Sequence, residues 1–205
     1  MISERKGKLI VLYGINNLGK STQAKLLLNN LLQYGHKAEY IKYPIYNLEP
    51  TGPKINDILR GGKKQTIPEQ ELQQLYAQNR FDYQPMLLSK LNRGTHIIAE
   101  DYIGTGLAWG VTKGADLVTL QNQNKGLFQE DIAILFDGER FIEGKEAKHL
   151  HESNDELMNR CRQVHLDLAK KYHWQIIPAN RAIPEVEQEV WKLVEVLIDN
   201  SQHSQ

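Results

Sequence analysis

The residues best suited to chemistry lie in a glycine-rich turn near the start of the chain. The segment GINNLGKS (14–21) matches the pattern G-x-x-x-x-G-K-[ST] at every fixed position. The glycines of such a turn let backbone N–H groups approach anionic oxygens, and the following helix adds a partial positive charge. Lys20 supplies a cation that bridges phosphates, and the hydroxyl of Ser21 can bind Mg²⁺. The turn therefore predicts a site for the phosphates of a nucleoside triphosphate.

This interpretation requires a strand before the turn and a helix after it. The apolar run KLIVLYG (8–14) is typical of a buried strand, and apolar residues repeat at helical spacing from 24 to 32. Further strand-like segments occur at 37–43, 95–101, 131–137 and 174–180, with room for a helix between neighbours. The pattern predicts an α/β fold of the P-loop NTPase class, in which helices flank a five-stranded parallel sheet in three layers.

The rest of the chain is expected to supply three long helices and two irregular segments. The helices are predicted at roughly 68–93, 153–172 and 184–199. Weak periodicity and many polar or glycine residues predict loops or flaps at 44–67 and 138–152, the second acting as a lid. A chain of 205 residues is long enough for one domain with a core, so we expect residues 1–205 to form a single domain.

Composition excludes several classes of protein. The 25 Lys and Arg residues balance 25 Asp and Glu residues, which argues against a basic surface for nucleic acid. The single cysteine, Cys161, cannot form an internal disulfide and fits a reducing compartment. The N-terminal residues lack the apolar stretch of a signal peptide, and no apolar run approaches the roughly 20 residues that span a bilayer. We expect a cytoplasmic protein that binds neither nucleic acid nor membranes.

Segments beyond the turn resemble the thymidylate kinases, P-loop enzymes that pass the γ-phosphoryl group of ATP to dTMP. They are KYPIYNLEPTGPKINDIL, LYAQNRFDY, AEDYIGTGLAWG, DIAILFDGERF and the lid-and-helix segment HESNDELMNRCRQVHLDLAKKY. The P-loop alone is common to many ATPases, whereas YAQNR with a following DY-x-x-T-G strand end is much more specific. The resemblance implies ATP and Mg²⁺ as cofactors, dTDP and ADP as products on the way to dTTP, and a homodimer.

The resemblance also assigns residues to the two nucleotides. On the ATP side it implies Gly14, Asn17, Gly19, Lys20, Ser21 and Thr22, and on the acceptor side Asn16, Lys42, Pro44, Tyr76, Arg80, Tyr102, Thr105 and Gly106. Lys42 matches a residue that contacts the monophosphate, although a lysine there is also an ordinary strand-end charge. Tyr102 matches a tyrosine that lies near the deoxyribose and disfavours a 2′-hydroxyl. Thr105 and Gly106 match positions near the pyrimidine edge, and Asn16 replaces an acidic residue that contacts the 3′-hydroxyl.

Tyr76 and Arg80 make physical sense of this assignment. Residues four apart on a helix project from one face, so the two side chains are neighbours. A ring beside a guanidinium group can stack on a nucleobase while the guanidinium hydrogen-bonds its edge. The alternative is a core tyrosine next to a solvated arginine.

The chain departs from the family at the strand end, where Glu100 and Asp101 replace the usual Asp-Arg pair. Glu100 keeps a carboxylate near the expected Mg²⁺, so Ser21 and Glu100 are the candidate metal ligands. The usual arginine grips the dTMP phosphate, which Asp101 would repel unless a cation intervenes. A cap on the following turn is an equally good interpretation of Asp101.

A second departure concerns the transition-state arginine, because Asn17 and Leu18 leave the P-loop without one. One well-placed arginine contributes on the order of 10³-fold in rate, so another cation must close over the phosphates. Arg140 is the first candidate and completes the expected catalytic set with Lys20 and Glu100. The other lid candidates are Lys145, Lys148 and His149. Arg162, on the helix that follows the lid, could support them. Each of these cations taken alone is more often a solvated surface charge.

These departures keep two other functions open. Loss of the strand-end arginine could redirect the enzyme to another deoxynucleotide or to a deoxynucleoside, although a nucleoside would leave Lys42 without an anion. The missing arginines also fit a catalytically impaired nucleotide-binding module. The intact residues Gly14, Gly19, Lys20 and Ser21 argue against that module.

Overall fold

The computed structural model describes residues 7–60, 67–141 and 151–202. The strands are β1 (Leu9–Tyr13), β2 (Ala38–Lys42), β3 (His96–Glu100), β4 (Ile132–Asp137) and β5 (Gln175–Pro178). The helices are α1 (Lys20–Gln33), α2 (Thr51–Arg60), α3 (Glu69–Asn92), α4 (Ile103–Thr112), α5 (Leu117–Gln123), α6 (His151–Tyr172) and α7 (Ile183–Gln202).

The strands form one parallel sheet in the order β2-β3-β1-β4-β5. Strand β1 lies at the centre, where Leu9 pairs with Ile97 of β3 and Ile10 pairs with Ile132 of β4. All five residues of β1 are buried, which explains why its sequence shows no polar alternation. The expected five-stranded parallel sheet is confirmed.

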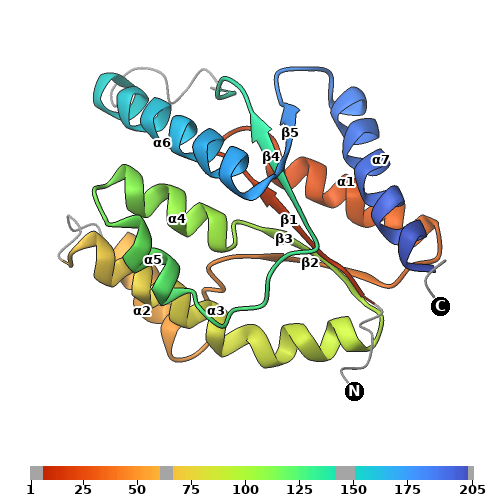
Figure 1. Ribbon diagram of the computed structural model, residues 1–205, viewed down its shortest axis with the longest axis horizontal. Coiled ribbons are helices and arrows are strands. Elements are labelled where there is room, and N and C mark those ends of the chain that lie inside the picture. Colours follow the sequence, from red (N-terminus) through yellow and green to blue (C-terminus); the bar gives the residue numbers. More distant parts are fainter. Residues whose placement is uncertain (1–6, 61–66, 142–150, 203–205) are drawn as a thin grey trace.

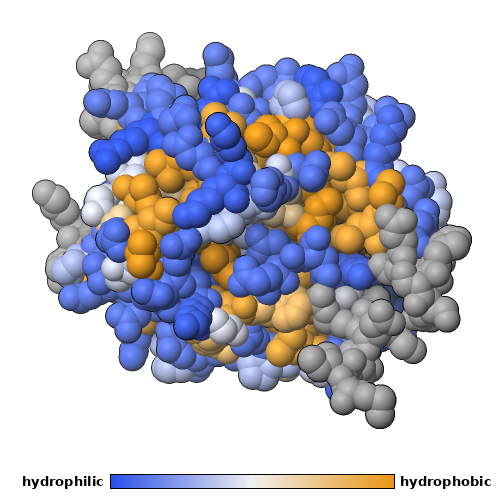
Figure 2. All heavy atoms as spheres, viewed as in Figure 1, coloured by the Kyte–Doolittle hydropathy of each residue, from blue (hydrophilic) through white to orange (hydrophobic). Residues whose placement is uncertain are grey.

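Helices cover both faces of this sheet. Figure 1 shows α1 and α7 together on one side, and α3, α4 and α6 on the other. Figure 2 shows hydrophilic side chains surrounding separate hydrophobic areas on the face viewed. Because the strands are parallel, their carboxyl ends lie at one edge of the sheet, where the segments after β1, β2, β3 and β4 meet. In the described ranges, no helix is both long and apolar enough to cross a membrane.

The expectation that 44–67 is entirely irregular is wrong, because α2 lies within it. Ile55 of α2 is fully buried, and the Oγ1 of Thr51 donates to Asp82 of α3 at 2.9 Å. A helix this short depends on tertiary contacts, which local periodicity does not reveal. Residues 61–66 and 142–150 lie outside the described residues, so the predicted lid is described only at 138–141 and at the start of α6.

Candidate active site

The P-loop (residues 14–21) joins the central strand to the start of α1. Gly14 has a φ of +137°, and a Cβ there would lie 2.6 Å from the carbonyl oxygen of Phe136, so only glycine fits. Gly19, with a φ of +79°, turns the chain into the helix that begins at Lys20. The buried Lys20 Nζ donates to the carbonyl oxygens of Gly14 and Ile15 at 2.8 and 2.9 Å. Its ammonium group thus lies over the loop that the phosphates would occupy.

Glu100 lies at the carboxyl end of β3 and collects three donors from neighbouring elements. The Ser21 hydroxyl lies 2.7 Å from its carboxylate, and Lys42 Nζ and the Tyr40 hydroxyl lie 2.6 Å from it. Burial opposes ionisation of Glu100, yet the bonds from Lys42, Tyr40 and Ser21 hold its pKa below its ordinary value. The structure therefore brings the two candidate Mg²⁺ ligands into direct contact, and a hydroxyl with a carboxylate is the hard oxygen donor set that Mg²⁺ prefers.

Tyr40 is a member of this group that sequence reasoning missed. It precedes Lys42 by two residues on β2, and residues at that spacing point to the same side of a strand. The spacing was visible in the sequence, but only the pairing of β2 with β3, which sets Lys42 opposite Glu100, shows what that side faces.

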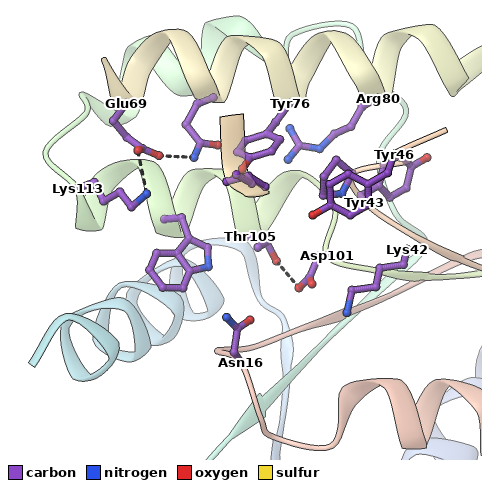
Figure 3. A pocket seen from close by; sticks show the side chains of 15 residues that line it. Asn16, Lys42, Tyr43, Tyr46, Glu69, Tyr76, Arg80, Asp101, Thr105 and Lys113 are labelled. Atoms are coloured by element: carbon purple, nitrogen blue, oxygen red, sulfur yellow. Dashed lines mark hydrogen bonds and ion pairs between the residues drawn. The ribbon is translucent and has the colours of Figure 1, made fainter. Parts of the chain in front are cut away.

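A pocket of about 330 Å³ lies beside this group, between α3 and α4 (Figure 3). Helix α3 lines it with Glu69, Gln73, Tyr76 and Arg80, whose spacing of four, three and four residues places them on one face. Helix α4 contributes Thr105 and Trp109, and Lys113 follows directly after its last residue at the same interval of four. The β2 end and the P-loop complete the wall with Lys42, Tyr43, Pro44, Tyr46 and Asn16. Every predicted acceptor-side residue except Tyr102 therefore lines this pocket.

The end of the pocket farthest from Lys42 is polar, and its side chains are joined by an ion pair and a hydrogen bond. Lys113 Nζ pairs with Glu69 at 3.1 Å, and Gln73 Nε2 donates to Glu69 at 2.6 Å. Arg80 is buried, and its Nη1 donates to Asn124 at 2.9 Å. A Cβ on Gly106 would lie 2.7 Å from Arg80 Nη2, so glycine makes room for the guanidinium group. Gln73, Trp109 and Lys113 were not predicted as lining residues, although their helical spacing from Tyr76 and Thr105 was a usable signal.

Tyr102 is the one predicted acceptor-side residue that lies behind the pocket wall. Its side chain is fully buried, and its hydroxyl donates to the carbonyl oxygen of Phe128 at 3.0 Å. Its ring packs behind Tyr43, with ring centroids 5.0 Å apart, and Tyr43 forms the pocket wall. Because its polar atom is satisfied by the backbone inside the protein, Tyr102 supports the wall through its contact with Tyr43.

Asp101 lines the same pocket with an unusual backbone conformation. Its φ is +60°, and Thr105 Oγ1 donates to its Oδ1 at 3.1 Å. Lys20 Nζ lies 3.8 Å from the same oxygen. Burial raises the pKa of Asp101, against the opposing effect of Lys20. The bond from Thr105 ties Asp101 to the first turn of α4, while the carboxylate remains part of the pocket wall.

The described candidates for the lid cation lie close to the end of β4. Arg140 pairs with Asp155 at 3.5 Å, and the next residue, Phe141, donates its N–H to the carbonyl oxygen of Asn17 in the P-loop at 2.8 Å. Arg162 makes a two-pronged ion pair with Asp137 at 2.6 and 2.9 Å. Arg140 is thus held next to the P-loop, whereas Arg162 is held by the carboxylate of Asp137. Lys145, Lys148 and His149 lie outside the described residues.

A second cavity of about 230 Å³ lies on the other side of the P-loop. Gly19 and Thr22 line it, together with Phe141 and Arg181, which sequence reasoning did not single out. A ring and a guanidinium group beside the start of α1 can hold the planar base of a nucleotide whose phosphates occupy the P-loop. Residues of the P-loop therefore line two cavities, of about 330 and 230 Å³.

Comparisons with known proteins agree with this arrangement. A family model described as thymidylate kinase matches residues 12–190. The chain is 26% identical over 199 residues to a thymidylate kinase from Homo sapiens, covering 95% of this chain and 92% of that protein. It is 29% identical over 195 residues to one from Arabidopsis thaliana, covering 92% and 71%. A solved thymidylate kinase from Candida albicans shares the fold, with a TM-score of 0.72 at 23% identity over 95% of this chain and 93% of that one.

Proposed function

Since the chain belongs to the thymidylate kinase family, we propose that it transfers the γ-phosphoryl group of ATP to dTMP, giving ADP and dTDP. The observation that carries the proposal is the position of the acceptor pocket. Asp101 lines that pocket and lies 3.8 Å from Lys20, the residue that would hold the ATP phosphates. An acceptor in the pocket would therefore lie beside the group to be transferred, as phosphoryl transfer requires.

The donor side would use the P-loop and its neighbours. The backbone N–H groups of Gly14, Asn17 and Gly19 would bind the phosphates, and Lys20 would leave its two carbonyl partners to bridge them. Ser21 and Glu100 would hold Mg²⁺, which when bound neutralises charge on the phosphates. Thr22 would lie beside the nucleoside part of ATP in the second cavity.

The acceptor side would divide into a phosphate end and a base end. Lys42 would contact the 5′-phosphate, and Asn16 and Pro44 would border the sugar and phosphate. At the other end Tyr76 would stack on thymine, while Arg80 hydrogen-bonds its edge. Thr105 and Gly106 form the opposing wall, and the absence of a side chain at Gly106 leaves space for Arg80.

Closure of a lid formed by about 138–152 would exclude water, so that ATP is not hydrolysed instead. Arg140 would then turn from Asp155 toward the transferring phosphoryl group and stabilise its charge. The proposal extends to a single domain over 1–205, a homodimer and a cytoplasmic location.

Asp101 favours a second candidate, a kinase for another deoxynucleotide or for a deoxynucleoside. A carboxylate in the acceptor pocket disfavours a phosphate next to it, whereas an uncharged acceptor would not be repelled. Lys42 argues against a nucleoside, because its charge would then have no acceptor phosphate to bind.

A coupled ADP-release assay with ATP and Mg²⁺ tests the proposal. It should be run with dTMP, dUMP, the other monophosphates and thymidine. Selective turnover of dTMP is expected, and Lys20→Ala should reduce the rate by at least about 100-fold because the phosphate-bridging cation is lost. Lys25→Ala, at an exposed position on the same helix, is the matched control and should retain the rate.

The other outcomes identify the alternatives. Turnover of thymidine but not dTMP would establish the deoxynucleoside kinase. ATP binding without turnover of any acceptor would leave the impaired nucleotide-binding module.

A further inference from the structure

The carboxylate of Asp101 is a fixed, negatively charged part of the acceptor pocket. Its backbone φ of +60° and the bond from Thr105 to Oδ1 hold the side chain in place, and the side chain keeps 16% of its accessible surface. Within the described part of the chain, Oδ2 receives no hydrogen bond. One carboxylate oxygen is therefore open to a ligand in the pocket.

The charge balance around Asp101 changes when nucleotides bind. Its ion-pair partner in the described residues is Lys20, at 3.8 Å, and the proposed function assigns that cation to the ATP phosphates. Lys42, the next cation along the pocket wall, is engaged by Glu100 at 2.6 Å. Asp101 would then keep only the bond from Thr105 to Oδ1, and its Oδ2 would face the acceptor without the nearby charge of Lys20. Such a group repels phosphate and is stabilised by a hydroxyl donor.

The position of Asp101 identifies the donor. In Figure 3, Asp101 lies between the base end of the pocket, marked by Tyr76 and Arg80, and the phosphate end, marked by Lys42. A nucleoside monophosphate lying along the pocket would set its sugar beside Asp101. The sugar of dTMP carries one free hydroxyl group, on C3′.

We propose that Asp101 is a specificity-determining residue whose carboxylate accepts a hydrogen bond from the 3′-hydroxyl of the acceptor. This inference rests on the proposed function and defines the acceptor more narrowly, as a deoxynucleotide with an intact 3′-hydroxyl. The residue that looks unfavourable for a phosphate thus acts on the sugar, and Lys42 is left to bind the phosphate.

The test compares dTMP with 3′-deoxythymidine 5′-monophosphate, which lacks only the 3′-hydroxyl. Wild-type kcat/KM should be on the order of 100-fold lower for the 3′-deoxy compound, since Oδ2 of a charged carboxylate is then left without a donor while Oδ1 keeps the bond from Thr105. Asp101→Gly removes the carboxylate and tolerates the positive φ, so the ratio between the two substrates should fall below about 3. Asp101→Asn keeps an acceptor oxygen without the charge, and an intermediate ratio of about 10 is expected.

Calorimetric titration of both nucleotides into each protein gives a readout that does not depend on turnover. Asp167→Asn, on the exposed side of α6, is the matched control and should keep the wild-type ratio. An equal preference in wild type, or a preference that survives Asp101→Gly, would overturn the inference while turnover of dTMP upholds the function. If dTMP were bound but not turned over, the proposed function would fail, and the ratio of the two dissociation constants would still decide the role of Asp101.

Discussion

At the scale of single residues, the Glu100 carboxylate connects the P-loop helix to the wall of the acceptor pocket. Ser21 and Lys42 come from the ATP side and the acceptor side, and each bonds to Glu100 at 2.7 Å or less. The Tyr40 hydroxyl is the third donor, at 2.6 Å from Oε2. Since Tyr40 is not among the residues that line the acceptor pocket, we expect it to act through Glu100 as a positioning residue.

Replacement of Tyr40 by Phe tests this positioning role. Loss of one donor to a carboxylate that keeps two others should lower kcat about 5- to 10-fold and leave the KM for dTMP within about 2-fold. The Mg²⁺ concentration for half-maximal rate should rise, because Glu100 becomes less rigid. Tyr34→Phe, on an exposed tyrosine, is the control. A kcat and Mg²⁺ dependence equal to those of wild type would contradict the role.

At the scale of elements, Asn79 fixes the loop after β2 to α3. Its Oδ1 accepts the N–H of Ile45 at 2.7 Å, and its Nδ2 donates to the Ile45 carbonyl oxygen at 3.1 Å and to Thr51 Oγ1 at 3.0 Å. The side chain is fully buried. The loop carries Tyr43 and Tyr46, so this one amide sets the distance between two walls of the acceptor pocket.

Asn79→Ala should therefore affect stability and substrate binding together. Three hydrogen bonds disappear and buried backbone groups lose their partner, so the free energy of unfolding should fall by about 2–3 kcal/mol. The KM for dTMP should rise about 10-fold while the KM for ATP changes little, because the P-loop is not part of this contact. Urea unfolding and steady-state kinetics measure both effects.

Gln74→Ala provides the control for this experiment. Gln74 lies on the exposed side of the same helix, so its replacement should change the free energy of unfolding by less than about 0.5 kcal/mol. A normal KM for dTMP in Asn79→Ala would show that the loop does not depend on the amide.

At the scale of the whole molecule, two buried histidines make stability depend on pH. Burial lowers the pKa of His165 to about 4, and burial with the neighbouring His36 and Lys8 lowers that of His96 to about 4. An unfolded histidine titrates near 6.5, so below that pH the unfolded chain takes up protons that the folded chain does not. The contribution of the two histidines to the free energy of unfolding is fully present above about pH 6.5 and is lost as the pH falls toward 4.

Urea unfolding at pH 7.5, 6.5 and 5.5 checks this dependence. Each histidine should contribute a loss of about 1 kcal/mol between pH 6.5 and 5.5, and His165→Gln should remove its share of that loss whatever its effect at pH 7.5. His173→Asn, at an exposed position, should keep the wild-type slope. An unchanged slope in His165→Gln would show that His165 does not titrate in this way.

The sequence by itself determined the strands, the long helices and the phosphate-binding turn. The repeat of apolar residues and the G-x-x-x-x-G-K-S spacing are properties of short segments, so they can be found without the fold. It also determined that Tyr76 and Arg80 share a face of α3, since helix geometry sets this spacing. Only the tertiary structure decided that Tyr40 meets Glu100, that Tyr102 turns inward, that α2 forms, and that Asp101 lies between the base end and Lys42. These features depend on contacts between segments far apart in the chain, and such contacts form only when the strands pair and the helices pack.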